Sequence, residues 1–285
     1  MASIVIENPP VSPITTDANA GSNLHFQFDT NNFAESDNDS NSSSLDEPIE
    51  VIETDYGSAE YWDKRYGAYS PFDWLMTWSH FKDQELNSFI EHSDKILMLG
   101  CGSAAFSADM YDDGYTNIVN IDLSSVVIEQ MQLASQARTE MTWEVMNCTD
   151  LKYENESFDV CFDKSTMDCI FCCDNSTHQI TEFMCEAWRV LKPGGLFICL
   201  SLHAPEKTLP YIVSDEKNNE FDWSTIEHFS IPNPKYEEGT QKAESYLCVV
   251  AIKPATSTDA VRDNRGVREP TLLKFMEGGG GGECT

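Results

Sequence analysis

One short stretch constrains the fold of this chain more than any other, the sequence KILMLGCG at residues 95–102. Ile96–Leu99 is an apolar run that ends at a glycine, which is typical of a strand buried on both faces of a parallel sheet. Gly100 and Gly102 predict a sharp turn after it, where the backbone can approach a ligand closely because neither residue carries a Cβ atom. Ser103 is expected to begin the helix that follows.

A carboxylate ends the next predicted strand, which we place at Asn117–Ile121. Asp122 would stand beside the glycine turn if the two strands are neighbours in one sheet. An acid in that place accepts hydrogen bonds from the 2′- and 3′-hydroxyls of a ribose. Gly100, Gly102 and Asp122 are therefore predicted to bind an adenosyl cofactor.

The identity of that cofactor needs evidence from further along the chain. Gly100-x-Gly102-x-x-Ala105 formally satisfies the dinucleotide fingerprint, so NAD is an alternative. Downstream come a predicted strand, a helix, the turn LKPGG at residues 191–195 and another strand. This order resembles the seven-stranded methyltransferases that bind S-adenosylmethionine, in which such a turn is frequent. The resemblance favours S-adenosylmethionine.

The predicted fold class is α/β, a doubly wound, Rossmann-like methyltransferase sheet of seven strands with helices on both faces. The ligand crevice is expected at the carboxyl ends of the first two strands. Helices are predicted at residues 58–66, with Ser58 as N-cap, and at residues 78–90. The parallel strands are placed at Ile96–Leu99, Asn117–Ile121, Met141–Val145, Phe158–Phe162 and Leu196–Leu200, and a closing antiparallel pair at Thr225–Ser230 and Tyr246–Ile252.

Charge and cysteine usage limit the partners and the compartment. A formal net charge of −30 argues against binding a nucleic-acid backbone and suits a basic partner. Apolar runs stay well short of the ~20 residues that a membrane span needs, and we see no secretory signal. The ten cysteines lie mostly in apolar stretches, which indicates free thiols in a reducing compartment. We expect a monomer in the cytoplasm, with the nucleus as a second location.

Both ends of the chain differ in composition from its centre. Residues 1–55 contain no Lys or Arg and are rich in Asp, Glu, Asn and Ser, so we predict a disordered acidic tail. Such a tail either adds solubility or recruits or shields a basic substrate. Residues 56–254 form the predicted methyltransferase domain. Residues 255–285, with a glycine run at 278–282, form a predicted flexible C-terminal tail.

Large aromatic residues crowd the segment ahead of the first strand, namely Trp62, Tyr66, Phe72 and Trp74. One interpretation is that they cap the open edge of the sheet. The other is that they close over the cofactor, because aromatic faces attract a sulfonium cation by ~0.5–2 kcal/mol. Such a lid would also exclude water from the methyl group.

Five motifs in order then resemble the lysine methyltransferases of translation elongation factor 1-alpha, in the methyltransferase-like family. They are YWDxRY at 61–66, FDW at 72–74, ILxLGCG at 96–102, DxSSVV at 122–127 and DKxTxD at 163–168. The resemblance covers about residues 56–201 and leaves out both tails. It implies S-adenosylmethionine as cofactor and a basic protein, such as an elongation factor, as partner.

The resemblance also implies roles for single residues. Trp62, Tyr66, Trp74 and Lys164 should contact the cofactor, Gly100 should lie under its methionine part, Asp122 should hold the ribose with Leu123 beside the adenine, and Asn147 and Cys148 should meet the adenine ring. The family usually has Asp at the place of Asn147 and often Glu at the place of Asp163. An amide still offers both a donor and an acceptor to adenine.

The chemistry of methyl transfer to lysine needs few acid–base groups. A lysine ammonium has no lone pair, and supplying the neutral amine near pH 7.4 costs about 4 kcal/mol at an unperturbed pKa of ~10.4. Burial lowers that pKa, after which the step depends mainly on positioning. We therefore assign no catalytic residue. Asp168 is the weak candidate, and the alternative for it is a carboxylate favoured at a helix N-terminus.

The sequence thus predicts methyl transfer from S-adenosylmethionine, with the lysine acceptor resting on the resemblance alone. A small-molecule methyltransferase and a non-catalytic methyltransferase-like interaction module are the alternatives, and Asn147 is the hint for the latter. The cysteines at 169, 172, 173 and 185, with His178, invite a zinc site. We expect no metal, because no second Cys-x-x-Cys pair follows.

Overall fold

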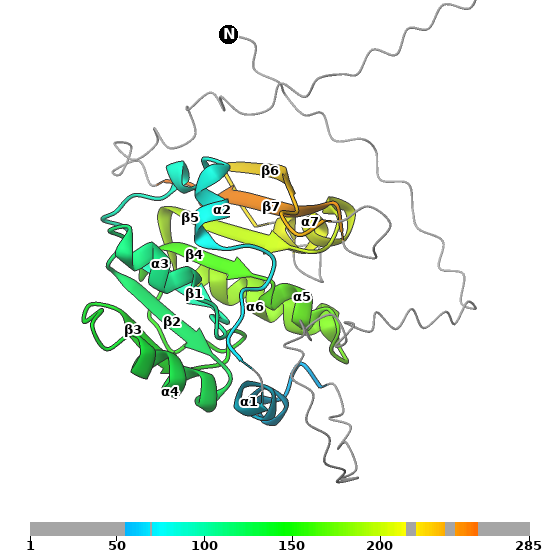
Figure 1. Cartoon of the computed structure of the whole chain (residues 1–285). Helices are drawn as coiled ribbons and strands as arrows, with labels where there is room; N and C mark the ends of the chain where they lie inside the picture. The colour runs from blue at the N-terminus through cyan, green and yellow to red at the C-terminus, as the bar shows by residue number, and fades with distance from the viewer. Residues whose placement is uncertain (1–54, 69, 215–220, 237–242, 256–285) are drawn as a thin grey trace, which may run out of the picture. The chain divides into compact units, whose positions relative to one another are not determined.

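The structure is a computed structural model that describes residues 55–68, 70–214, 221–236 and 243–255. The predicted tails lie almost wholly outside these residues, so the three-part division of the chain stays a prediction. The described residues form a seven-stranded sheet with strand order β3-β2-β1-β4-β5-β7-β6 (Figure 1). Within the described part of the chain, no helix has the length and apolar character needed to cross a membrane.

Every predicted strand is present, and the fold class is confirmed. β1 to β5 pair in parallel and β7 lies antiparallel between β5 and β6. Their bounds are β1 Ile96–Leu99, β2 Ile118–Asp122, β3 Thr142–Val145, β4 Phe158–Lys164, β5 Leu191–Ser201, β6 Thr225–Pro232 and β7 Ser245–Ile252.

Helices cover both faces of this sheet (Figure 1). α2, α3 and α4 pack on the face to which Ile96 and Met98 of β1 point, and α5 and α6 pack on the face of Leu97 and Leu99. This alternation follows from the two-residue period of a strand and explains why β1 is apolar throughout. The helices are α1 Ala59–Ala68, α2 Trp78–Asp83, α3 Phe106–Asp112, α4 Ser125–Ala134, α5 Thr166–Ile170, α6 Ser176–Val190 and α7 Pro205–Val213.

The single helix predicted at residues 78–90 is wrong. α2 ends at Asp83, Glu85 adopts a left-handed backbone with φ 57°, and a 3₁₀ turn follows at Leu86–Phe89. The break lets the segment pack in two places. Phe81 packs on the sheet, and the ring centroid of Phe89 lies 6.0 Å from that of Phe229 of β6. Tertiary packing has overridden the helical period here.

Two further local predictions are wrong. α3 begins at Phe106 rather than at Ser103, whose Oγ instead accepts a hydrogen bond of 3.4 Å from the amide of Phe72. The LKPGG segment is part of β5 rather than a turn before it. Gly194 takes φ 73° inside that strand, and its amide donates to the carbonyl of Lys253 over 2.9 Å, so the segment forms an irregular strand start beside the end of β7.

The aromatic core beneath the site gives a direct test of this packing. Phe162 of β4 is fully buried, with ring centroids 5.4 Å from Phe81 and 5.2 Å from Phe106. We expect Phe162→Ala to lower the free energy of unfolding by about 3–5 kcal/mol, because it leaves a cavity. Urea unfolding measures this. Leu133→Ala, at a side chain 66% exposed, is the control and should stay within about 0.5 kcal/mol of wild type; equal losses would contradict the packing.

Candidate active site

Strand register brings the predicted site residues into one row. Leu99 of β1 lies between Ile121 of β2 and Asp163 of β4. The residues one step further along, Asp122, Gly100 and Lys164, therefore stand side by side at the carboxyl ends of three neighbouring strands. Because the strand order reverses at β1, this is the edge where a doubly wound sheet binds its ligand.

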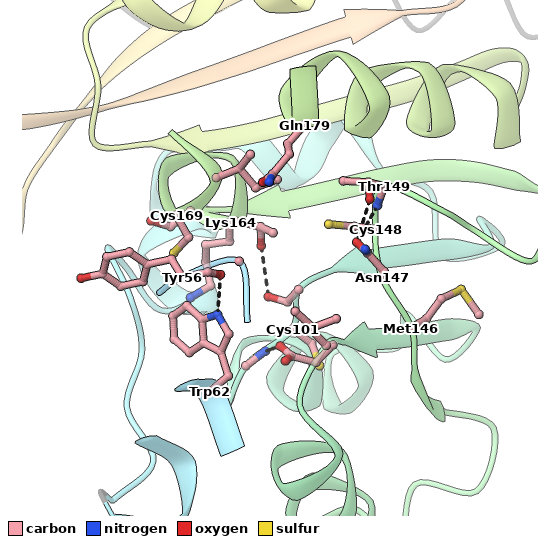
Figure 2. Close-up of a pocket in the computed structure, with 18 of the residues that line it drawn as sticks. Tyr56, Trp62, Cys101, Met146, Asn147, Cys148, Thr149, Lys164, Cys169 and Gln179 are labelled. Atoms are coloured by element: carbon pink, nitrogen blue, oxygen red, sulfur yellow. Dashed lines mark hydrogen bonds between the residues drawn. The ribbon is translucent and has the colours of Figure 1, made fainter. Parts of the chain in front are cut away.

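A pocket of about 330 Å³ opens over this row (Figure 2). That volume is within the range for small-molecule sites. Every cofactor-binding residue predicted from the sequence lines it: Trp62, Tyr66, Trp74, Gly100, Gly102, Asp122, Leu123, Asn147, Cys148 and Lys164.

The bend after β1 requires glycine twice. Gly100 has φ 67°, and a Cβ atom there would lie 2.2 Å from Oγ1 of Thr166. Thr166 is itself fixed, since its hydroxyl donates to the carbonyl of Leu99 over 2.7 Å. Gly102 has φ 56°, and an added Cβ would approach the hydroxyl of Tyr66 to 3.0 Å. Side chains at these two positions would press on Thr166 and Tyr66, which both line the pocket, and would strain the backbone.

Asp122 is held against that bend by backbone amides. Its Oδ2 accepts from the amide of Gly102 and its Oδ1 from the amide of Ser124, each over 2.9 Å. Burial raises the pKa of this carboxyl to about 6, and the hydrogen bonds from Ser124 and Gly102 partly oppose that rise. Each oxygen keeps a second lone pair for an incoming hydroxyl. The carboxylate is thus placed and charged to accept hydrogen bonds from a ribose.

Aromatic side chains form one wall of the pocket. Trp62 and Tyr66 of α1 stack with ring centroids 5.6 Å apart, and Nε1 of Trp62 donates to the carbonyl of Tyr56 over 2.9 Å (Figure 2). Trp74 also lines the pocket, whereas Phe72 packs edge-on against it at 4.8 Å between centroids. Three of the four predicted aromatics therefore face the ligand space, and Phe72 supports one of them.

Asn147 and Cys148 form the opposite end of the pocket. Oδ1 of Asn147 accepts from the amide of Thr149 over 2.9 Å and from its hydroxyl over 3.0 Å (Figure 2). An Asp would make the same turn, so the departure from the family pattern keeps the local backbone and adds an amide donor. Burial raises the pKa of Cys148 to about 12, which keeps its thiol neutral.

Lys164 is a buried cation in the pocket wall. Its Nζ donates to the carbonyl of Trp74 over 2.9 Å and lies 3.6 Å from Oδ1 of Asp73. The Phe106 ring centroid is 5.4 Å away. Burial lowers the pKa of this amine to about 8, and Asp73 opposes that change.

The weak catalytic candidate, Asp168, does not line the pocket. It is fully buried, and its carboxylate accepts hydrogen bonds from the hydroxyls of Ser165 and Ser201 and from the amide of Leu202. These bonds join the start of α5 to the end of β5. This geometry favours a structural role for Asp168, and we predict that it makes no contact with an acceptor.

Several lining residues were missed at the sequence level. Thr166 had a signal, because it belongs to the DKxTxD motif at residues 163–168, but Gln179 and Glu182 come from α6 and have no local pattern. Within the described ranges, no group of three or more His, Cys, Asp and Glu side chains could hold a metal ion. The missed residues are Tyr56, Gly57, Cys101, Met146, Thr149, Ser165, Thr166, Cys169, Ile170, Gln179 and Glu182.

Comparison with known sequences shows what this chain is similar to. Residues 97–199 match the family model of a methyltransferase domain. The eEF1A lysine and N-terminal methyltransferase of Mus musculus is 35% identical over 153 residues, which are 52% of this chain and 22% of that protein. The EEF1A lysine methyltransferase 4 of Mus musculus is 28% identical over 180 residues, 59% of this chain and 69% of that protein. The chain thus spans under a quarter of the first of these two relatives.

Solved structures share the fold. Haemonchus contortus phosphoethanolamine N-methyltransferase 2, solved with S-adenosylhomocysteine, aligns with a TM-score of 0.50 at 15% identity, over 68% of this chain and 58% of that one. A protein solved in a study of thioacetal formation from a disulfide in echinomycin biosynthesis has a TM-score of 0.50 at 16% identity, over 72% and 97%. At these identities the likeness concerns the fold.

The raised pKa of Asp122 predicts how ligand affinity depends on pH. The carboxylate is ionised above about pH 6, and its protonated form offers fewer acceptor lone pairs to a ribose. We expect the Kd of S-adenosylhomocysteine to rise about fivefold between pH 6 and pH 5, because the ionised fraction falls from a half to about a tenth, and to stay nearly constant from pH 7 to pH 8. Calorimetry at each pH measures this. Asp122→Asn should bind weakly with a flat profile from pH 5 to 7; an unchanged slope would assign the titration to another group.

Replacing Asp168 tests its structural assignment. We expect Asp168→Ala to lower the free energy of unfolding by about 3 kcal/mol, because it leaves buried donors without an acceptor. Urea unfolding measures the loss. Asp168→Asn keeps the shape and separates the two roles, since a variant with wild-type stability and ligand affinity but no methyl transfer would make Asp168 a catalytic residue.

Proposed function

We propose that this chain uses S-adenosylmethionine to methylate a lysine side chain of a basic protein, through the domain at residues 97–199 that matches the methyltransferase family model. The observation that supports this best is the hydrogen bond between the glycine bend and Asp122, which lies in a pocket lined by aromatic rings. A ribose acceptor and a set of aromatic faces thereby share one pocket.

The residues of the pocket fit that cofactor. Asp122 would hold the two ribose hydroxyls, while Asn147 and Cys148 would meet the adenine. Gly100 and Gly102 line the pocket without side chains, which suits a ligand lying on the backbone. Trp62, Tyr66 and Trp74 present the aromatic faces that a sulfonium favours.

The pocket also suits a reaction that depends on positioning. S-adenosylmethionine supplies a methyl group already activated by its sulfonium. The chain's own residues therefore need to bind, orient and keep water away, and buried rings such as Trp62 and Tyr66 exclude water. A lysine that enters the pocket beside these aromatic rings would have a lowered pKa, which makes its lone pair available.

The protein acceptor is supported by the relatives and by charge. Both relatives named above are methyltransferases of eEF1A by name, one for lysine and N-terminal sites and one for lysine. A net charge of −30 gives this chain a long-range attraction for a basic protein. We therefore propose elongation factor 1A, or a basic protein like it, as the acceptor.

Methylation in a cell lysate tests the proposal. Wild type with labelled S-adenosylmethionine should methylate a lysine of a basic protein, identified by mass spectrometry. Asp122→Ala should lower kcat/KM about a hundredfold, because it removes two charge-assisted hydrogen bonds to the ribose. Asp150→Ala, at a side chain 69% exposed, is the matched control and should retain activity.

Two results would contradict the proposal. Label found only in a metabolite pool would identify a small-molecule methyltransferase. No heat and no thermal shift with S-adenosylhomocysteine would favour a non-catalytic interaction module.

A further inference from the structure

Lys164 places a buried amine in the wall of a pocket for a cationic cofactor. Its side chain is 6% exposed, and it stands in the same row as Gly100 and Asp122. A cofactor that holds its ribose on Asp122 and crosses the bend at Gly100 extends toward β4, where Lys164 ends the strand. The sulfonium would then lie near the buried Lys164 amine, and like charges repel strongly where burial keeps water away.

Few groups offset the charge of Lys164. Trp74 contributes a carbonyl at 2.9 Å and Asp73 a carboxylate at 3.6 Å, and Oδ1 of Asp73 makes no hydrogen bond within the described residues. The other charged or titratable groups that act on it are Asp163 of β4, Lys235 after β6 and Cys101 of the bend.

These neighbours leave Lys164 close to neutrality. Lys235 is a cation and supplies no negative charge. The thiol of Cys101 supplies none near neutral pH either, because burial raises its pKa. Asp163 is fully buried, and burial raises its pKa to about 7. Asp73 is therefore the main counter-charge, and the pKa of Lys164 already lies at about 8. One further positive charge nearby would remove the proton at neutral pH.

Resting on the proposed function, we propose that Lys164 is a catalytic residue that gives up its proton when the sulfonium cofactor binds and then accepts the proton of the incoming lysine ammonium. Lys164 is thus a base that the charge of its own cofactor switches on. This role goes beyond the cofactor contact that the family resemblance implies for it.

The protons and electrons of this cycle balance. Cofactor binding releases one proton from Lys164 to solvent. The acceptor ammonium, whose pKa burial and the same sulfonium would also lower, then passes one proton to the neutral Lys164 amine. The freed lone pair of the acceptor forms the N–CH₃ bond while the S–CH₃ bond breaks and leaves its electron pair on sulfur. The product amine leaves with its positive charge, and Lys164 stays protonated beside the now neutral thioether. The net release is one proton per methyl group.

Proton linkage of binding tests this without any acceptor. Calorimetry at pH 7.0 in buffers of different ionisation enthalpy gives the number of protons released on binding. At a pKa of about 8 Lys164 is about nine-tenths protonated beforehand, so wild type should release close to one proton more than Lys164→Gln with S-adenosylmethionine. With S-adenosylhomocysteine the two proteins should not differ. The ligand's own amino group titrates equally in both proteins and cancels.

Control variants keep the test decisive. Lys152→Gln, at a side chain 67% exposed, should release as many protons as wild type. If Lys164→Gln does not bind, Asp73→Asn replaces it, because loss of the counter-charge leaves Lys164 partly neutral beforehand and should lower the release below the wild-type value. Equal release by wild type and the variant that binds, or an equal difference with both ligands, would overturn the role of Lys164. Failure of wild type to bind either ligand would instead overturn the proposed function.

Discussion

The site depends on one hydrogen bond between two strands, from the amide of Gly102 to Oδ2 of Asp122 over 2.9 Å. It fixes the bend after β1 against the end of β2, and therefore sets the gap that a nucleoside would enter. Asp122 also accepts from the amide of Ser124, whose hydroxyl oxygen caps α4 by accepting from the amide of Val127 over 3.3 Å. The bend, the acid and the helix start thus form one hydrogen-bonded unit.

The same unit positions the aromatic wall. The Asp63 carboxylate on α1 accepts from the hydroxyl of Ser124 over 2.5 Å and from the amide of Val126 over 3.2 Å. Further along, Nε2 of Gln130 on α4 donates to the carbonyl of Tyr66 over 3.2 Å. Figure 1 shows α1 lying beside α4. Trp62 and Tyr66 are therefore held by the helix that follows Asp122, so the rings and the ribose acceptor have one support.

Which features the sequence predicts depends on how far apart in the chain the interacting residues lie. The strands were predictable, because an apolar run such as Ile96–Leu99 is short, ends at a glycine and carries the mark of burial on both faces in its own composition. The pocket residues were predictable because the ends of parallel strands meet at one edge and the motifs kept their order. The break at Glu85, the irregular start of β5 at Gly194 and the inward position of Asp168 depend on partners far away in the chain. Gln179 reaches the pocket only because α6 crosses behind the sheet, and no local pattern carries that information.

Burial acts in opposite directions on the two charged residues at the ends of the row. It raises the pKa of Asp122 to about 6 and lowers the pKa of Lys164 to about 8. A tenfold change in proton affinity corresponds to about 1.4 kcal/mol, so keeping both groups charged near pH 7 lowers the stability of the fold. Shifted pKa values of this kind are characteristic of functional sites. Between about pH 6 and 8 the acid is ionised for a ribose while the amine needs only one added positive charge to lose its proton. Ribose binding by Asp122 and the proposed proton transfer by Lys164 would therefore share one pH window, because both residues line one pocket.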